Sequence, residues 1–396
     1  MQLFKNSKLV NADFKSHQSK MAFIVNNGLI EWVGSQNKVP KHYKISKAVD
    51  LKNKLVFPSF IECHTHTIFA GSRAAEFELR NQGISYLEIA QKGGGILASM
   101  SATRKAPAGE LLKLTQARVN NFLNQGVSTL EIKSGYALDL KNEVKMLEIL
   151  KKIKGPQIIS TFLGAHARPP EFAENSAYLQ YLVQKVLPII KNKNLAKRVD
   201  IFIENKFFEK AESIVYLKKA MELGFEITIH ANQLSLSTGA DLALSLGAQS
   251  ADHVIHLNDS LIRNFSKSKT VAVLLPLADF YMKCAYPPAR KLIDAGACVA
   301  LATDYNPGSC PSQDLSLVGL LARLEMKMTL PEVFKAYTWG AAKALGIEST
   351  EGSLEVKKAA NFICTDAELS DFFYSAGRTP AHSLFIRGKE IKTGLS

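Results

Sequence analysis

The hydrophobic residues of this chain gather in short apolar runs, separated by segments in which apolar residues recur three or four positions apart. The runs are rich in β-branched residues and predict eight strands. The segments between most of them, such as residues 109–126 and 141–155, have the periodicity of helices. The strands are expected at residues 55–66, 129–136, 158–167, 199–204, 225–232, 250–256, 269–276 and 298–308.

Strands that alternate with helices pair in parallel, and eight such units in about 250 residues are typical of a (β/α)8 barrel. The alternative α/β architecture, an open doubly wound sheet, would place a GxGxxG fingerprint after its first strand. No such motif follows residues 55–66. The sequence therefore predicts an α/β fold built on a TIM-like barrel.

The two ends of the chain have a different pattern of predicted elements from the barrel. Short strands joined by tight turns are expected before residue 55, with a hairpin at Asn27-Gly28, and similar strands return after residue 352. We expect residues 1–54 and 353–396 to form one small composite β-sandwich domain. Residues 55–352 would form the barrel.

Several histidines lie at the ends of the predicted strands. His64 and His66 end the first strand, and their period-2 spacing points both imidazoles to the same side. His230 ends the fifth strand, His253 lies at the end of the sixth, and Asp304 ends the eighth. Because barrel enzymes build their sites at the carboxyl ends of the strands, we expect these groups to converge.

Imidazoles and a carboxylate together suit Zn²⁺ or Fe²⁺ and leave a coordination position for water. Such an ion lowers the pKa of bound water to about 7, so the pattern indicates hydrolysis. The HTH motif alone would be equally compatible with a chance pair of histidines on a polar strand end. The joint placement of the strand-end residues favours the metal.

Composition is that of an ordinary globular protein, with 46% hydrophobic and 21% charged residues among 396. No apolar run approaches the roughly 20 residues that cross a bilayer, and the first residues lack a signal-peptide core. Five widely spaced cysteines without a CxxC pair argue against disulfides and against a thiolate zinc site. We expect a cytoplasmic protein with reduced thiols and no membrane partner.

The net charge of +13 raises the question of an anionic partner. The lysines, however, are scattered over predicted helix faces without the interleaved aromatic residues of a nucleic-acid surface. We therefore expect solvated faces and no nucleic-acid partner. The charge would also attract a small anionic substrate.

An ordered set of motifs resembles the imidazolonepropionase family of the amidohydrolase superfamily. The motifs are VFPSFIECHTHTIFAGSRAAEF, GGGI, STLEIKSGYAL, FLGAHARP, IHANQLSLSTGA, SADHVIH and ALATDYNPGS. The resemblance implies one zinc or iron ion per subunit, held by His64, His66, His230 and Asp304. It also implies hydrolysis of 4-imidazolone-5-propanoate to N-formimidoyl-L-glutamate, the third step of histidine degradation. We further expect a homodimer.

The same resemblance places residues around the substrate. Arg73, otherwise a solvated surface arginine, would bind the propanoate through its fork-shaped guanidinium. His253 would stabilise the oxyanion or relay a proton, and Asp304 would accept the proton of water and pass it to the leaving nitrogen. The remaining residues expected to line the pocket are Tyr86, Tyr136, His166, Asn306, Gly308 and Ser309. By residue type alone, Tyr86 would suit helix packing better.

One position departs from the pattern of some family members, which have Glu where this chain has Gln233. An amide cannot act as a general base, so we expect Gln233 to bind the substrate ring and Asp304 and His253 to handle protons. Other functions stay open from the residues alone. They are another hydrolase of cyclic amidines or ureides, a heteroaromatic deaminase, or a metal-free binding protein on a decayed barrel.

Overall fold

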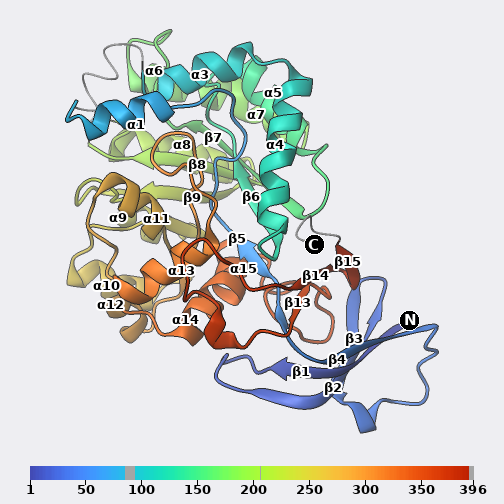
Figure 1. Ribbon diagram of the computed structural model, residues 1–396. Coiled ribbons are helices and arrows are strands. Elements are labelled where there is room, and N and C mark those ends of the chain that lie inside the picture. The colour runs from blue at the N-terminus through green and yellow to red at the C-terminus, as the bar shows by residue number, and fades with distance from the viewer. Residues whose placement is uncertain (85–93, 206, 392–396) are drawn as a thin grey trace.

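The computed structural model describes residues 1–84, 94–205 and 207–391 (Figure 1). Its eight parallel barrel strands confirm the predicted fold class. In chain order they are β5 (Phe60–Glu62), β6 (Val127–Lys133), β7 (Gln157–Ala165), β8 (Arg198–Ile203), β9 (Glu226–Ala231), β10 (Ser250–His253), β11 (Val271–Leu274) and β12 (Val299–Leu301). A parallel bridge between Thr65 and Tyr305, just beyond β5 and β12, closes the barrel.

Helices cover the outside of the barrel (Figure 1). The predicted helix at residues 109–126 is α4 (Ala108–Leu123), which buries Leu111, Thr115, Val119 and Phe122 on one face. The others are α1 (Ala74–Asn81), α3 (Ile96–Lys105), α5 (Leu140–Leu150), α6 (Asn175–Tyr181), α7 (Leu187–Asn192), α8 (Lys210–Glu222), α9 (Gly239–Leu246), α10 (Asp259–Ser266), α11 (Pro276–Met282), α12 (Ala289–Asp294), α13 (Leu315–Leu324), α14 (Leu330–Lys335) and α15 (Ala341–Ala344).

The first predicted strand, residues 55–66, is divided between two sheets. Its first part is the end of β4 (Lys47–Pro58), which pairs with β1 (Gln2–Val10) and β13 (Phe362–Thr365) outside the barrel. The chain breaks at Ser59 and enters the barrel as β5. The cause is Pro58, because proline has no N–H to extend a sheet ladder. One apolar run thus supplies two sheets.

Strands from both ends of the chain form the second sheet, in the order β15-β14-β13-β4-β1-β2-β3. The strands not yet placed are β2 (His17–Asn26), β3 (Leu29–Ser35), β14 (Ser383–Ile386) and β15 (Lys389–Ile391). β2 and β3 form the predicted hairpin, since Asn27 and Gly28 have the positive φ angles of 49° and 83° that such a turn requires.

This second sheet curls around its own apolar core. Phe4 of β1 stacks on Phe23 and also meets Phe385 of β14 at 5.7 Å between ring centroids, although β13 and β4 lie between those strands. Figure 1 shows the sheet beside the barrel. The exact domain boundaries stay a prediction. Among the described residues, no helix is long and apolar enough to cross a membrane.

Candidate metal centre and active site

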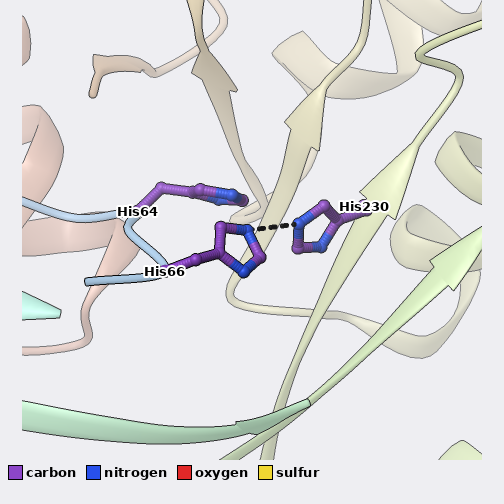
Figure 2. Close-up of side chains that lie close together, drawn as sticks. All are labelled: His64, His66 and His230. Atoms are coloured by element: carbon purple, nitrogen blue, oxygen red, sulfur yellow. Dashed lines mark hydrogen bonds between the residues drawn. The ribbon is translucent and has the colours of Figure 1, made fainter. Parts of the chain in front are cut away.

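Four of the predicted residues converge at the carboxyl end of the barrel. His64 and His66 follow β5, His230 lies in β9, and their imidazoles face one another (Figure 2). The Nε2 atoms of His66 and His230 are 3.4 Å apart. Oδ1 of Asp304, which follows β12, is 3.5 Å from His64 Nε2 and 3.4 Å from His66 Nε2. The structure therefore brings together side chains from the ends of the first, fifth and eighth barrel strands, as the sequence predicts.

The chemistry of these atoms fits a metal ion. Nε2 of His64 is buried and has no hydrogen-bond partner among the described residues. The ligand atoms of His64, His66 and His230 all lie within 4.8 Å of one another. Buried polar atoms are normally satisfied, so a shared cation explains this cluster of inward-facing nitrogens.

Carboxylates behind the histidines orient the imidazoles. Asp252 Oδ2 lies 2.7 Å from Nδ1 of His64, and Asp200 Oδ2 lies 3.0 Å from Nδ1 of His230. A carboxylate at Nδ1 favours the tautomer with its proton on that nitrogen, which leaves the Nε2 lone pair for a metal. Asp252 and Asp200 therefore orient the imidazoles of His64 and His230 so that Nε2 of each can bind a metal.

The protonation of the cluster is set by opposing forces. Burial lowers the pKa of His66 to about 4, so this imidazole is neutral. Burial and the Lys133 ammonium also disfavour the charged form of His64, but Asp252 and Asp304 outweigh them and raise its pKa to about 9, so a metal ion would displace the proton from Nε2 of His64. Burial favours neutral Asp304, yet contacts with His64 and His66 hold its pKa well below the usual range.

Buried glutamates hold the backbone that carries the ligands. Glu62 accepts hydrogen bonds from the N–H groups of His64 and Thr303, and Glu131 accepts one from Thr65. Burial raises the pKa of Glu62 to about 8, although these hydrogen bonds oppose the shift. The loops after β5 and β12 are therefore tied together directly beneath the cluster.

Two of the residues with a predicted catalytic role have strained backbones. His253 has φ 74° and Asp304 has φ 54°, in the left-handed region that non-glycine residues seldom adopt. Such strain collects at functional sites, where the surrounding structure over-determines the geometry. His253 Nε2 or Nδ1 comes within 4.8 Å of ligand atoms of His64 and Asp304, so His253 borders the cluster. Burial lowers the pKa of His253 well below its usual range.

A cavity of about 460 Å³ includes His66, His230 and Asp304 in its lining. Its lining includes most residues that the sequence predicts for the substrate, namely Arg73, Tyr136, His166, Gln233, Asn306, Gly308 and Ser309. Tyr86, also predicted there, lies outside the described residues. The volume suits a small ring with a short side chain.

One wall of the cavity is aromatic. The rings of His66 and His166 stack at 5.1 Å, and Tyr136 meets His166 at 5.4 Å. His166 Nδ1 lies 3.2 Å from the carbonyl oxygen of Gly135, which leaves its Nε2 for the cavity. Buried Glu143 accepts hydrogen bonds from Gly135, Ala137 and Leu138, and so fixes the loop that carries Tyr136.

Another part of the cavity lining is basic. Arg73 is held by its Nε–H, which donates to Glu76 Oε2 at 2.8 Å. Arg80, which the sequence reasoning missed, also lines the cavity and donates to the carbonyl oxygen of Gly308 at 3.4 Å. The sequence could have indicated Arg80, because a residue seven positions after Arg73 lies on the same face of a helix.

Asn306 and Gln233 differ in how they can act. The side chain of Asn306 accepts from the N–H groups of Gly308 and Ser309 and donates to the carbonyl oxygen of Asp304. Its amide therefore shapes the loop after β12. Within the described part of the chain, the Gln233 amide donates one long hydrogen bond, 3.6 Å, to the sulfur of Met282.

Sequence reasoning also missed the charged residues inside the barrel strands. Glu131 and Lys133 lie in β6, and Asp200 and Asp252 lie in β8 and β10. All four are buried. Charged residues in otherwise apolar strands could have indicated them, because such groups are seldom buried unless they are paired.

The barrel and its histidine-carboxylate cluster define the class of metal-dependent amidohydrolases. Residues 208–391 match the model described as "Amidohydrolase family". Solved structures share the fold at low identity. An adenosine deaminase from Xanthomonas campestris with bound zinc aligns with TM-score 0.74 and 16% identity, covering 98% of this chain and 92% of its own. Guanine deaminase from E. coli aligns with TM-score 0.70 and 14% identity, covering 99% of this chain and 98% of its own.

Curated relatives narrow the class to a family. Imidazolonepropionase from Bdellovibrio bacteriovorus is 52% identical over 98% of this chain and 92% of its own length. Imidazolonepropionase from Fusobacterium nucleatum is 42% identical over 98% of this chain and 95% of its own length. The chain belongs to the imidazolonepropionase family, as the sequence motifs predict.

Proposed function

We propose that this chain hydrolyses 4-imidazolone-5-propanoate to N-formimidoyl-L-glutamate at the cluster of His64, His66, His230 and Asp304. The observation that carries the proposal is the convergence of these groups beneath a cavity with Arg73 on its wall. Membership of the family supports the same reaction. The reaction breaks a carbon–nitrogen bond of a cyclic amide.

A divalent ion bound by these ligands would supply an activated water near neutral pH and polarise the ring carbonyl. The ligand set of three imidazoles and one carboxylate suits zinc or iron equally well. Four protein ligands leave a fifth position for solvent, as hydrolysis requires. The metal would be one ion per subunit of a cytoplasmic homodimer.

Binding is assigned to the basic and aromatic walls. Arg73 would pair with the propanoate, because a guanidinium matches a carboxylate through two parallel hydrogen bonds. Tyr136 and His166 would pack against the ring on the other side, and Gln233 would hydrogen-bond it. The loop of Asn306, Gly308 and Ser309 would complete the binding site, and the family resemblance assigns Tyr86 to the same substrate.

Proton transfer falls to Asp304 and His253. Asp304 is ionised, so it can accept the proton that water loses as the new C–O bond forms. The same proton then goes to the ring nitrogen as the C–N bond breaks, so Asp304 ends the cycle as it began. His253, a neutral imidazole beside Asp304, can donate a hydrogen bond to the developing oxyanion.

The test is a turnover assay with 4-imidazolone-5-propanoate, followed by the loss of the ring's ultraviolet absorbance. We expect turnover that stops after treatment with a chelator and returns with zinc or iron. A heteroaromatic amine, offered as a deaminase substrate, should release no ammonia. Metal-dependent ammonia release without ring opening would contradict the proposal and favour a deaminase.

A further inference from the structure

Lys133 places one buried ammonium beneath the metal ligands. It is the last residue of β6 and is 1% exposed. Its Nζ lies 2.9 Å from Glu131 Oε1, 2.9 Å from Asp200 Oδ2 and 3.6 Å from Asp252 Oδ2. The ammonium thus forms ion pairs with carboxylates from three barrel strands, β6, β8 and β10.

Two of those carboxylates meet the metal ligands with the same oxygen atoms that face Lys133. Oδ2 of Asp252 is 2.7 Å from His64 Nδ1, and Oδ2 of Asp200 is 3.0 Å from His230 Nδ1. Each aspartate therefore joins the ammonium to one imidazole.

The third carboxylate reaches the HTH motif through the backbone. While Oε1 of Glu131 meets Lys133, its Oε2 accepts a hydrogen bond from the N–H of Thr65 at 3.2 Å. Thr65 stands between His64 and His66. The N–H of Lys133 itself donates to the carbonyl oxygen of Thr65 at 2.9 Å. One residue is thereby connected to all three histidines.

The energetics of this network depend on the cation. Three buried carboxylates close together repel one another and are costly to keep out of water unless a cation and hydrogen bonds compensate. Among the described residues, Lys133 is the one Lys or Arg that forms an ion pair with any of these three carboxylates. Without it, Asp200 and Asp252 would turn apart and release the Nδ1 atoms that they orient.

We propose that Lys133 is a positioning residue that fixes the orientation and tautomer of His64 and His230, and thereby the affinity and geometry of the metal site. The proposal rests on the metal site of the proposed function. It assigns no contact between Lys133 and the substrate or the metal. Its effect passes through Asp252, Asp200 and Glu131.

The test compares Lys133→Met with Lys145→Met. Lys145 is a suitable control because it is half-buried and, among the described residues, its ammonium donates to the carbonyl oxygens of Thr103, Arg104 and Ala106 and to no carboxylate. Zinc affinity is measured by competition with a chromophoric chelator. We expect Lys133→Met to weaken zinc binding by about 10–100-fold, the usual cost of losing an outer-shell partner, and Lys145→Met to leave it unchanged.

Cobalt spectra give a readout that a general loss of stability would not move. Cobalt-loaded Lys133→Met should show a shifted visible absorption band, whereas cobalt-loaded Lys145→Met should match the wild type. Wild-type zinc affinity together with a wild-type cobalt spectrum in Lys133→Met would overturn the proposal. If Lys133→Met does not fold, Lys133→Gln, which keeps a neutral donor, is judged by the same two criteria.

These readouts separate the proposal from the proposed function. Wild-type protein that binds zinc but does not open the ring would remove the assigned reaction and leave the role of Lys133 intact. Wild-type protein that binds no zinc would remove the metal site and this proposal with it. Full turnover in the wild type, with unchanged metal binding in Lys133→Met, would remove the role of Lys133 alone.

Discussion

Gly308 and Arg73 are in direct contact across the mouth of the cavity. A Cβ atom on Gly308 would lie 2.0 Å from Nη1 of Arg73, so the guanidinium rests against the bare backbone of the loop after β12. Any side chain at this position would push the guanidinium away. The glycine is thus needed for the close approach of its neighbour and not for an unusual φ angle.

Gly308→Ala should therefore weaken substrate binding. Displacing Arg73 removes a charge-assisted hydrogen-bonded pair worth roughly 1.5–3 kcal/mol, so we expect KM to rise about 10–100-fold with a smaller change in kcat. Steady-state kinetics with 4-imidazolone-5-propanoate measure both constants. Gly109→Ala is the control, because a Cβ at Gly109 meets no atom within 4 Å. An unchanged KM in Gly308→Ala would show that Arg73 does not bind the substrate.

Glu143 should control the position of Tyr136. Glu143→Leu leaves the N–H groups of Gly135, Ala137 and Leu138 without their acceptor, at a cost of about 1–3 kcal/mol for each buried group. We expect a lower free energy of unfolding and a raised KM. Glu143→Gln keeps an acceptor oxygen, so its free energy of unfolding and its KM should lie between those of the wild type and of Glu143→Leu. Urea unfolding and kinetics make the comparison, and a wild-type KM in Glu143→Leu would refute the link to Tyr136.

The buried carboxyl of Glu62 should make stability depend on pH. Burial raises its pKa in the folded protein from 4.5 to about 8, so the folded state holds this proton more tightly than the unfolded chain does. The resulting stability is complete below pH 4.5 and is lost as the pH rises to about 8. Glu62→Gln cannot titrate, so its free energy of unfolding should fall less over this range.

Urea unfolding of the metal-free protein at several pH values measures that difference. Glu110→Gln, a change at an exposed residue of α4, is the control and should follow the wild type. Parallel curves for wild type and Glu62→Gln would mean that Glu62 is ionised in the folded protein throughout.

Substitutions of His253 and Gln233 should affect different kinetic constants. If His253 stabilises the oxyanion or moves a proton, His253→Asn should lower kcat by about 10²–10⁴-fold with metal content unchanged. If Gln233 only binds the ring, Gln233→Ala should mainly raise KM. The opposite result, with kcat lost in Gln233→Ala and retained in His253→Asn, would transfer the chemical role to the amide position.

Much of the fold could be predicted because its signals are local. Apolar runs alternating with helical periodicity define the barrel, and the Asn27-Gly28 turn defines the first hairpin. Pro58 marks the division of the first run, but the sequence does not show that the two halves belong to different sheets, since both are apolar and only their pairing partners distinguish them. Those partners, β1 and β13 on one side and β6 on the other, are far away in the chain.

The convergence of His64, His66, His230 and Asp304 was also predictable, because each lies at a strand end and parallel strands end at one edge. The network behind the ligands was not. Lys133, Asp200 and Asp252 come from three strands, and their pairing depends on which residues of those strands point inward at the same level of the barrel. Asn306 was expected at the substrate, yet its amide is engaged with its own loop, a preference of Asn that only the turn geometry reveals.

The central claim is that one metal ion lies between His64, His66, His230 and Asp304. The most direct measurement is an anomalous difference map from crystals of zinc-loaded protein, with data collected on both sides of the zinc absorption edge. The account predicts a single strong peak about 2.0–2.2 Å from the three Nε2 atoms and from an Asp304 carboxylate oxygen. A map without a peak there, or with its peak at other residues, would contradict it.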